Sequence, residues 1–166
     1  MPLPPSPDRE ALHLRKIDLR GYRRSDGLYD IEARMTDTKT HAFKRPAYDS
    51  PVPAGEALHD MWVRLVVDDE FLVHDVIAAT DVSPFPVCRE AVDALTSLKG
   101  LRIGAGFQRA VRERLSGAKG CTHLMELLVP LATTAFQTLA PIRLARPDKL
   151  DANGRPVRID SCYGYA

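Results

Sequence analysis

The stretch YDIEARMT, residues 29–36, decides the fold class. Apolar and polar side chains alternate along it, which is the period of a β-strand with one buried face. Ser25-Asp26-Gly27 lies just upstream, and Asp-Gly pairs tolerate the positive φ of tight hairpin turns. A second extended run precedes this turn, so the sequence predicts a first β-hairpin.

A second hairpin is predicted further along the chain. The runs HDMWVRLVV (59–67) and FLVHDVIAAT (71–80) are rich in strand-forming residues and flank a short acidic turn. Between the two hairpins, residues 42–56 contain three prolines. This composition favours a surface loop that could also cover a site.

After residue 86 the apolar period becomes helical. We predict helices at about 87–99, 105–115 and 122–140, followed by an irregular tail. Strands followed by helices indicate an α+β domain over residues 11–166, with an antiparallel sheet of about four strands and three helices packed on one face. Residues 1–10 contain four prolines and are predicted to be a disordered arm.

Composition narrows the function classes. The chain has 166 residues, 45% of them hydrophobic, and a formal net charge of +1, which fits a single globular domain and argues against nucleic acid as a partner. We identify no signal peptide and no apolar run of the roughly 18 to 20 residues that span a membrane, so we expect a cytoplasmic protein without a membrane partner. Cys88, Cys121 and Cys162 are widely spaced, which suits reduced thiols.

The third predicted helix is the most informative element. Between Gly120 and Ile142 its only charged side chain is Glu126. Most of its polar residues, together with Pro130, fall within an arc of about 100°, whereas the remaining circumference is apolar with Thr138 as the one clear exception. We therefore predict a helix buried on most sides, with a polar stripe that is either satisfied internally or lines a cavity. The stripe comprises His123, Glu126, Pro130, Thr133, Thr134 and Gln137.

His123 and Glu126 are three residues apart, which places imidazole and carboxylate side by side on a helix. A carboxylate raises the pKa of a histidine, and burial raises the pKa of a carboxylate, so the two are candidates for general acid and base. A purely structural His–Glu pair is the alternative and stays open. Candidate substrate-binding residues are Tyr29, Arg34, His59 and Thr134.

Two other chemistries use the same region. Cys121 precedes the helix, where the helix dipole would acidify its thiol, and His123 would be its base if Cys121 lies outside the regular turn. His123 and Glu126 are also potential metal ligands together with His41, His59 or His74. These histidines are scattered and form no recognised motif, so we predict no metal and no cofactor.

Five strings resemble, in this order, the bacterial family catalogued as domain of unknown function 2889. They are GYRRSDGLYDIEARMTDTK (21–39), HDMWVRLVVD (59–68), GLRIGAGF (100–107), GCTHLMELL (120–128) and ATTAFQT (132–138). The resemblance implies a cofactor-independent lyase of aromatic-compound catabolism, with retro-aldol cleavage that releases formaldehyde from a lignin-derived aromatic dimer. It supplies no catalytic residues.

Two other function classes stay open: a non-catalytic protein that binds a small ligand or another protein, and a thiol-dependent hydrolase. A small aromatic substrate is the expected partner. We also consider a homodimer, because an exposed sheet of this size commonly has its edge or open face covered.

Overall fold

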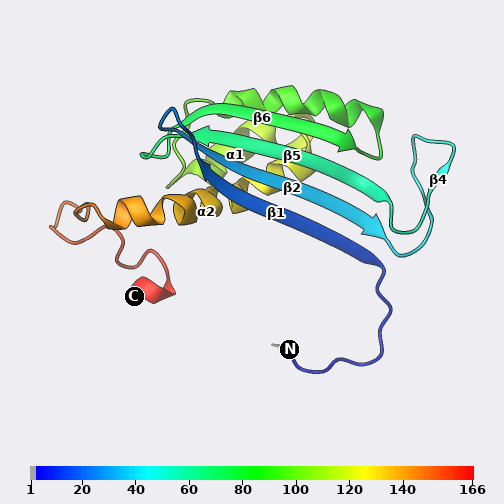
Figure 1. Ribbon diagram of the computed structural model, residues 1–166, viewed down its shortest axis with the longest axis horizontal. Coiled ribbons are helices and arrows are strands. Elements are labelled where there is room, and N and C mark those ends of the chain that lie inside the picture. The colour runs from blue at the N-terminus through cyan, green and yellow to red at the C-terminus, as the bar shows by residue number, and fades with distance from the viewer. Residues whose placement is uncertain (1–2) are drawn as a thin grey trace.

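A four-stranded antiparallel sheet forms the centre of the molecule (Figure 1). The computed structural model describes residues 3–166. The strands are β1 (His13–Arg23), β2 (Tyr29–Lys39), β5 (Ala57–Val67) and β6 (Val73–Val82), and they lie side by side in the order β1-β2-β5-β6. The predicted α+β class, the sheet of four strands and both hairpins are therefore confirmed.

The proline-rich segment between the hairpins carries a small hairpin of its own. Its two strands are β3 (Phe43–Lys44) and β4 (Pro51–Val52), which pair only with each other. The segment leaves the sheet where β2 ends and returns where β5 begins, so it projects from that end of the sheet (Figure 1).

The helical elements follow the strands as predicted: the first runs alongside the last strand of the sheet, and the two α-helices lie on one side of the sheet (Figure 1). They are η1 (Pro86–Leu98), α1 (Phe107–Leu115) and α2 (Thr122–Leu144), with the short turns η2 (Gly117–Lys119) and η3 (Tyr163–Tyr165).

The first predicted helix, η1, is a 3₁₀-helix and not an α-helix. The hydroxyls of Thr96 and Ser97 donate to carbonyls three residues earlier, at 2.7 Å each. Leu95 and Leu98, three positions apart, fall on the same side of a three-residue turn, and both are buried.

The core lies between the sheet and the helices. Odd-numbered residues of β2 and β5 point toward the helices, and Ile31, Met35, Met61 and Leu65 are fully buried there. From α2 the buried residues are Leu124, Leu127, Leu128, Leu131, Ala132, Ala135 and Leu139. By length and composition α2 would also be able to cross a membrane, but core helices meet the same criterion.

The expectation that α2 is buried around most of its circumference is wrong for its outer side. Val129 and Phe136 remain 38% and 43% exposed. The reason is geometric: the sheet covers one side of α2, and α1 covers only part of the other.

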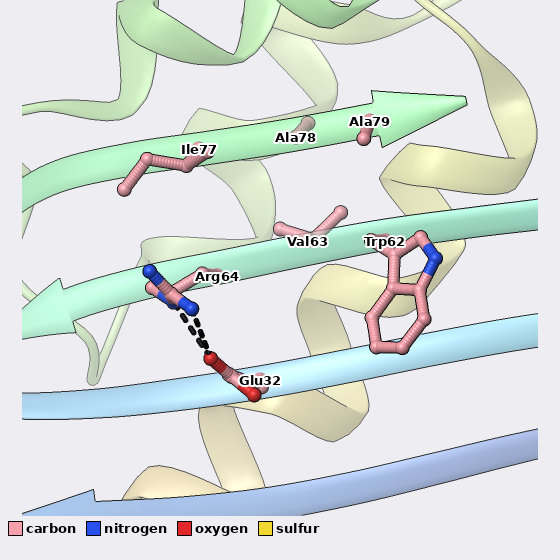
Figure 2. A pocket seen from close by; sticks show the side chains of 7 residues that line it. All are labelled: Glu32, Trp62, Val63, Arg64, Ile77, Ala78 and Ala79. Carbon is pink, nitrogen blue, oxygen red and sulfur yellow. Dashed lines mark hydrogen bonds and ion pairs between the residues drawn. The ribbon is translucent and has the colours of Figure 1, made fainter. Parts of the chain in front are cut away.

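The opposite face of the sheet is open to solvent. Figure 2 shows a shallow pocket of about 240 Å³ on this face, beside the Trp62 ring, where the Arg64 guanidinium donates to Glu32 at 2.7 Å. The free edge of β1 has no strand partner within residues 3–166. The homodimer stays a prediction.

The two ends of the described chain have little regular structure. Residues 3–12 contain no helix or strand and are exposed, whereas residues 1 and 2 of the predicted arm lie outside the described residues. Residues 145–166 form turns and η3, in line with the predicted irregular tail.

Candidate functional site

A row of polar side chains crosses the buried face of the sheet near one end. Arg15 of β1 is paired with Asp37 of β2, which is paired with His59 of β5. Side chains alternate between the two faces along each strand, and all three occupy positions on the buried face, so they point toward the helices. His13 of β1 and His123 of α2 join them, and we call these five residues the Asp37 cluster.

Asp37 is the centre of this cluster and is only 1% exposed. Its Oδ1 accepts hydrogen bonds from Arg15 Nε at 2.8 Å and His13 Nε2 at 3.1 Å, and its Oδ2 accepts from Arg15 Nη2 at 2.8 Å and His59 Nδ1 at 2.9 Å. Burial would raise the pKa of Asp37, but the Arg15 hydrogen bonds and charge outweigh it and lower the pKa to about 2. The carboxylate is therefore ionised at neutral pH, and its oxygens are fully engaged.

His59 has the geometry of a base held by a carboxylate. Asp37 binds its Nδ1, whereas Nε2 is buried and has no hydrogen-bond partner among the described residues. Burial and the charge of His123 lower the pKa of His59, and together they outweigh the opposite effect of Asp37. His59 is therefore neutral at pH 7, with Nδ1 as donor to Asp37 and Nε2 free to accept a proton.

His123 has the opposite electrostatic bias. Its ring stacks on that of His59, with ring centroids 4.0 Å apart and planes tilted by 37°. A hydrogen bond with Cys121 raises the pKa of His123 above its usual value, despite the opposing effect of burial. Two adjacent imidazoles are thus biased toward different protonation states, an arrangement found where one group acts as acid and the other as base.

Cys121 lies at the N-cap position of α2, with extended backbone angles of φ −88° and ψ 125°. It is therefore outside the regular turn, which is the condition for reaching His123. Burial would raise the pKa of the Cys121 thiol, but hydrogen bonds from the His123 side chain and from the backbone N–H groups of Leu124 and His123 lower it.

Glu126 does not lie in a buried pair with His123. Its side chain is 52% exposed, and its Oε2 accepts a hydrogen bond from Arg15 Nη1 at 3.1 Å. Arg15 thus bridges Glu126 and Asp37, and its own side chain is 35% exposed. Solvent reaches the Asp37 cluster from this side.

The structure brings His59 and His123 together but places the other candidate residues elsewhere. Tyr29 is buried in the core at the far end of β2, about 26 Å from Asp37 along the strand. Arg34 lies on the open face of the sheet and pairs with Asp60 at 2.7 Å. Thr134 is about 16 Å from His123 along α2, and its hydroxyl donates to the Pro130 carbonyl.

Sequence reasoning missed Asp37, Arg15 and His13. A usable signal existed for Asp37: it continues the inward phase of Ile31 and Met35, so the strand pattern places a carboxylate on the core side. A buried carboxylate requires partners, which directs attention to inward positions of the neighbouring strands.

Asp37, His59 and His123 also offer potential metal-ligand atoms within 4.8 Å of one another. Two features argue against that use. Both oxygens of Asp37 are already occupied by hydrogen bonds, and a divalent cation beside the Arg15 guanidinium would be repelled. His74, a ligand candidate from the sequence, instead pairs with Asp68 at 2.9 Å.

A family model described as "Protein of unknown function (DUF2889)" matches residues 13–137. The chain belongs to the DUF2889 family. The DUF2889 match contains all four strands of the sheet, η1, α1 and the greater part of α2, and therefore every residue of the Asp37 cluster. Comparisons with curated proteins and with solved structures found no match.

Proposed function

We propose that the protein is an enzyme in which His59 acts as general base and His123 as general acid. The observation that carries the proposal is the buried His59 Nε2, which has no hydrogen-bond partner among the described residues and belongs to a ring stacked on that of His123. An unpaired buried nitrogen costs free energy, so its retention favours a catalytic use over a structural one. The opposed pKa shifts of the two imidazoles support the same assignment.

Asp37 and Arg15 position the base in this proposal. Asp37 fixes the His59 tautomer through Nδ1, and Arg15 keeps the carboxylate ionised. Because the His123 ring stacks on that of His59 in the free protein, we expect it to rotate when substrate enters from the solvent-exposed side at Arg15 and Glu126. In this proposal Glu126, a candidate acid or base from the sequence, holds Arg15 through a hydrogen bond, and His59 replaces it as the general base.

The reaction that we propose is retro-aldol cleavage of a small aromatic compound by this protein as a carbon–carbon lyase. His59 removes the proton of a primary hydroxyl, the carbon–carbon bond breaks, and the oxygen and its carbon leave as formaldehyde. The electron pair of the broken bond stays on the aromatic fragment. It expels an adjacent leaving group or takes a proton from His123. Base and acid are the groups that this chemistry requires, and a cofactor is not.

The test is an assay of formaldehyde release from phenolic dimers that carry a primary hydroxyl, with purified wild-type protein and single variants. We expect His59→Ala and His123→Ala each to lower turnover at least about 100-fold, a typical contribution of general acid–base catalysis. His74→Ala is the matched control, since it also removes a histidine paired with an aspartate, but on β6 and outside the cluster. Its turnover should equal that of the wild type.

The proposal fails if both cluster variants fold and keep full turnover. If dimers bind to the wild type without any product, the protein is instead a non-catalytic binder of small ligands.

A thiol-dependent hydrolase is the second candidate, favoured by the contact between Cys121 and His123. A thiolate at a helix N-terminus beside an imidazolium is an activated nucleophile. Iodoacetamide treatment and Cys121→Ser would then abolish ester hydrolysis. The lyase requires no nucleophile at this position, so formaldehyde release that survives in Cys121→Ser supports the first proposal over the second.

A further inference from the structure

A second candidate site lies on the outer side of α2. An open cavity of about 650 Å³ is bordered by α2, by the segment that leads into α1, and by residues 161–165. Its apolar walls come from Ile103, Phe107, Val129, Ala132, Phe136 and Tyr165. This volume is within the range of about 300 to 1,000 Å³ that is typical of small-molecule sites.

The chemistry of the cavity wall is uniform. None of its lining residues carries a charge, although 27% of the chain is charged. Polar groups are few and neutral, among them the amide of Gln137 and the hydroxyl of Thr133, which donates to the Pro130 carbonyl and leaves its oxygen free to accept. A wall of this kind disfavours an ionic ligand, whose charge would lose hydration without gaining a counter-charge.

The cavity also accounts for the exposed apolar side chains of α2. Val129 and Phe136 line it and are 38% and 43% exposed. The Phe136 ring is held by Phe71, with centroids 4.6 Å apart, so it forms a fixed aromatic wall. Contiguous exposed apolar surface rimmed by polar groups is typical of binding sites.

This cavity is separate from the Asp37 cluster. It begins at Val129, six residues beyond His123 and about 9 Å along the helix axis, and Phe136 projects about 140° away from His123 around the helix. Its last wall, which includes Cys162 and Tyr165, lies beyond the family match that ends at residue 137.

We propose that this cavity binds an uncharged, largely apolar molecule with at least one ring, stacked against Phe136 and hydrogen-bonded to Gln137. The site is independent of the chemistry at His59 and His123.

The first test measures binding of the neutral dye N-phenyl-1-naphthylamine by its fluorescence, with full-length protein. We expect saturable binding, and Thr133→Trp, which fills the cavity, should weaken it at least about tenfold. Arg109→Trp is the matched control, since Arg109 lies on α1 with 86% exposure and does not line the cavity. Equal affinity in the wild type and both variants would overturn the proposal.

The second test needs no substitution and so does not depend on the folding of a variant. The dye should slow alkylation of Cys162 by N-ethylmaleimide, measured peptide by peptide by mass spectrometry, because Cys162 lines the cavity. Cys88 lies on η1, away from the cavity, and should react at an unchanged rate. Unprotected Cys162 at saturating dye would also overturn the proposal.

Discussion

Replacing Asp37 with asparagine should destabilise the protein by an amount that depends on pH. In the folded protein the pKa of Asp37 is lowered from 3.8 to about 2 by Arg15. At neutral pH this difference corresponds to about 2.5 kcal/mol of folding free energy. An asparagine also turns a donor toward groups that are themselves donors, so we expect a total loss of about 2 to 4 kcal/mol at pH 7.

The stabilising effect of the Asp37 carboxylate should be lost at acidic pH. A carboxyl group with a lowered pKa in the folded state stabilises the fold above its unfolded pKa, and the benefit disappears as the pH falls through the folded pKa. For Asp37 that window extends from about pH 4 down to pH 2. The difference in unfolding free energy between wild type and Asp37→Asn should therefore shrink by about 2 kcal/mol between pH 6 and pH 2.

Urea denaturation followed by circular dichroism measures both quantities. Asp18→Asn is the control, because Asp18 is also paired with an arginine, Arg20, but on the solvent-exposed face of the sheet. Its unfolding free energy should stay close to that of the wild type. A constant difference between wild type and Asp37→Asn from pH 6 to pH 2 would refute the electrostatic account of the cluster.

Three further outcomes are expected. Gly21→Ala should lower the melting temperature, because a Cβ at this position of β1 would overlap the Thr138 side chain of α2, and Thr138→Ala in the same chain should restore part of the loss. Leu131→Ala should cost about 2 to 5 kcal/mol in urea denaturation, since the side chain is fully buried and leaves a void in the core. In the lyase assay, turnover should rise as the pH passes the lowered pKa of His59 and fall as it passes the raised pKa of His123, with a maximum between the two; a profile without the acidic limb would contradict His59 as base.

The sheet was predictable because its strands carry a strict two-residue period. Residues 29–36 alternate without exception, and both hairpins have recognisable turns. The 3₁₀ conformation of η1 was not predictable from the sequence, because its apolar spacing also fits an α-helix. The hydroxyl contacts of Thr96 and Ser97 arise only in the folded chain. The sequence likewise does not show which side of α2 the sheet leaves uncovered.

For the candidate site, the sequence indicated His123 and included His59 among the candidates. It paired His123 with Glu126 because helical spacing was the only geometry available before the strands were in register. The partners that the structure supplies are Asp37 and Cys121. Asp37 faces His59 through strand pairing, and Cys121 reaches His123 because the helix begins one residue later.

The Asp37 cluster joins the first strand of the sheet to the start of the last long helix, and the contact between Arg15 and Glu126 spans 111 residues of sequence. During synthesis the sheet strands leave the ribosome well before α2, and Asp37 and His59 would be held by the sheet while His123 is still inside the exit tunnel. Long-range contacts of this kind form late in folding. The site is therefore completed only once α2 has left the tunnel, so a nascent chain stalled before α2 would carry a nearly finished sheet and no acid partner for His59.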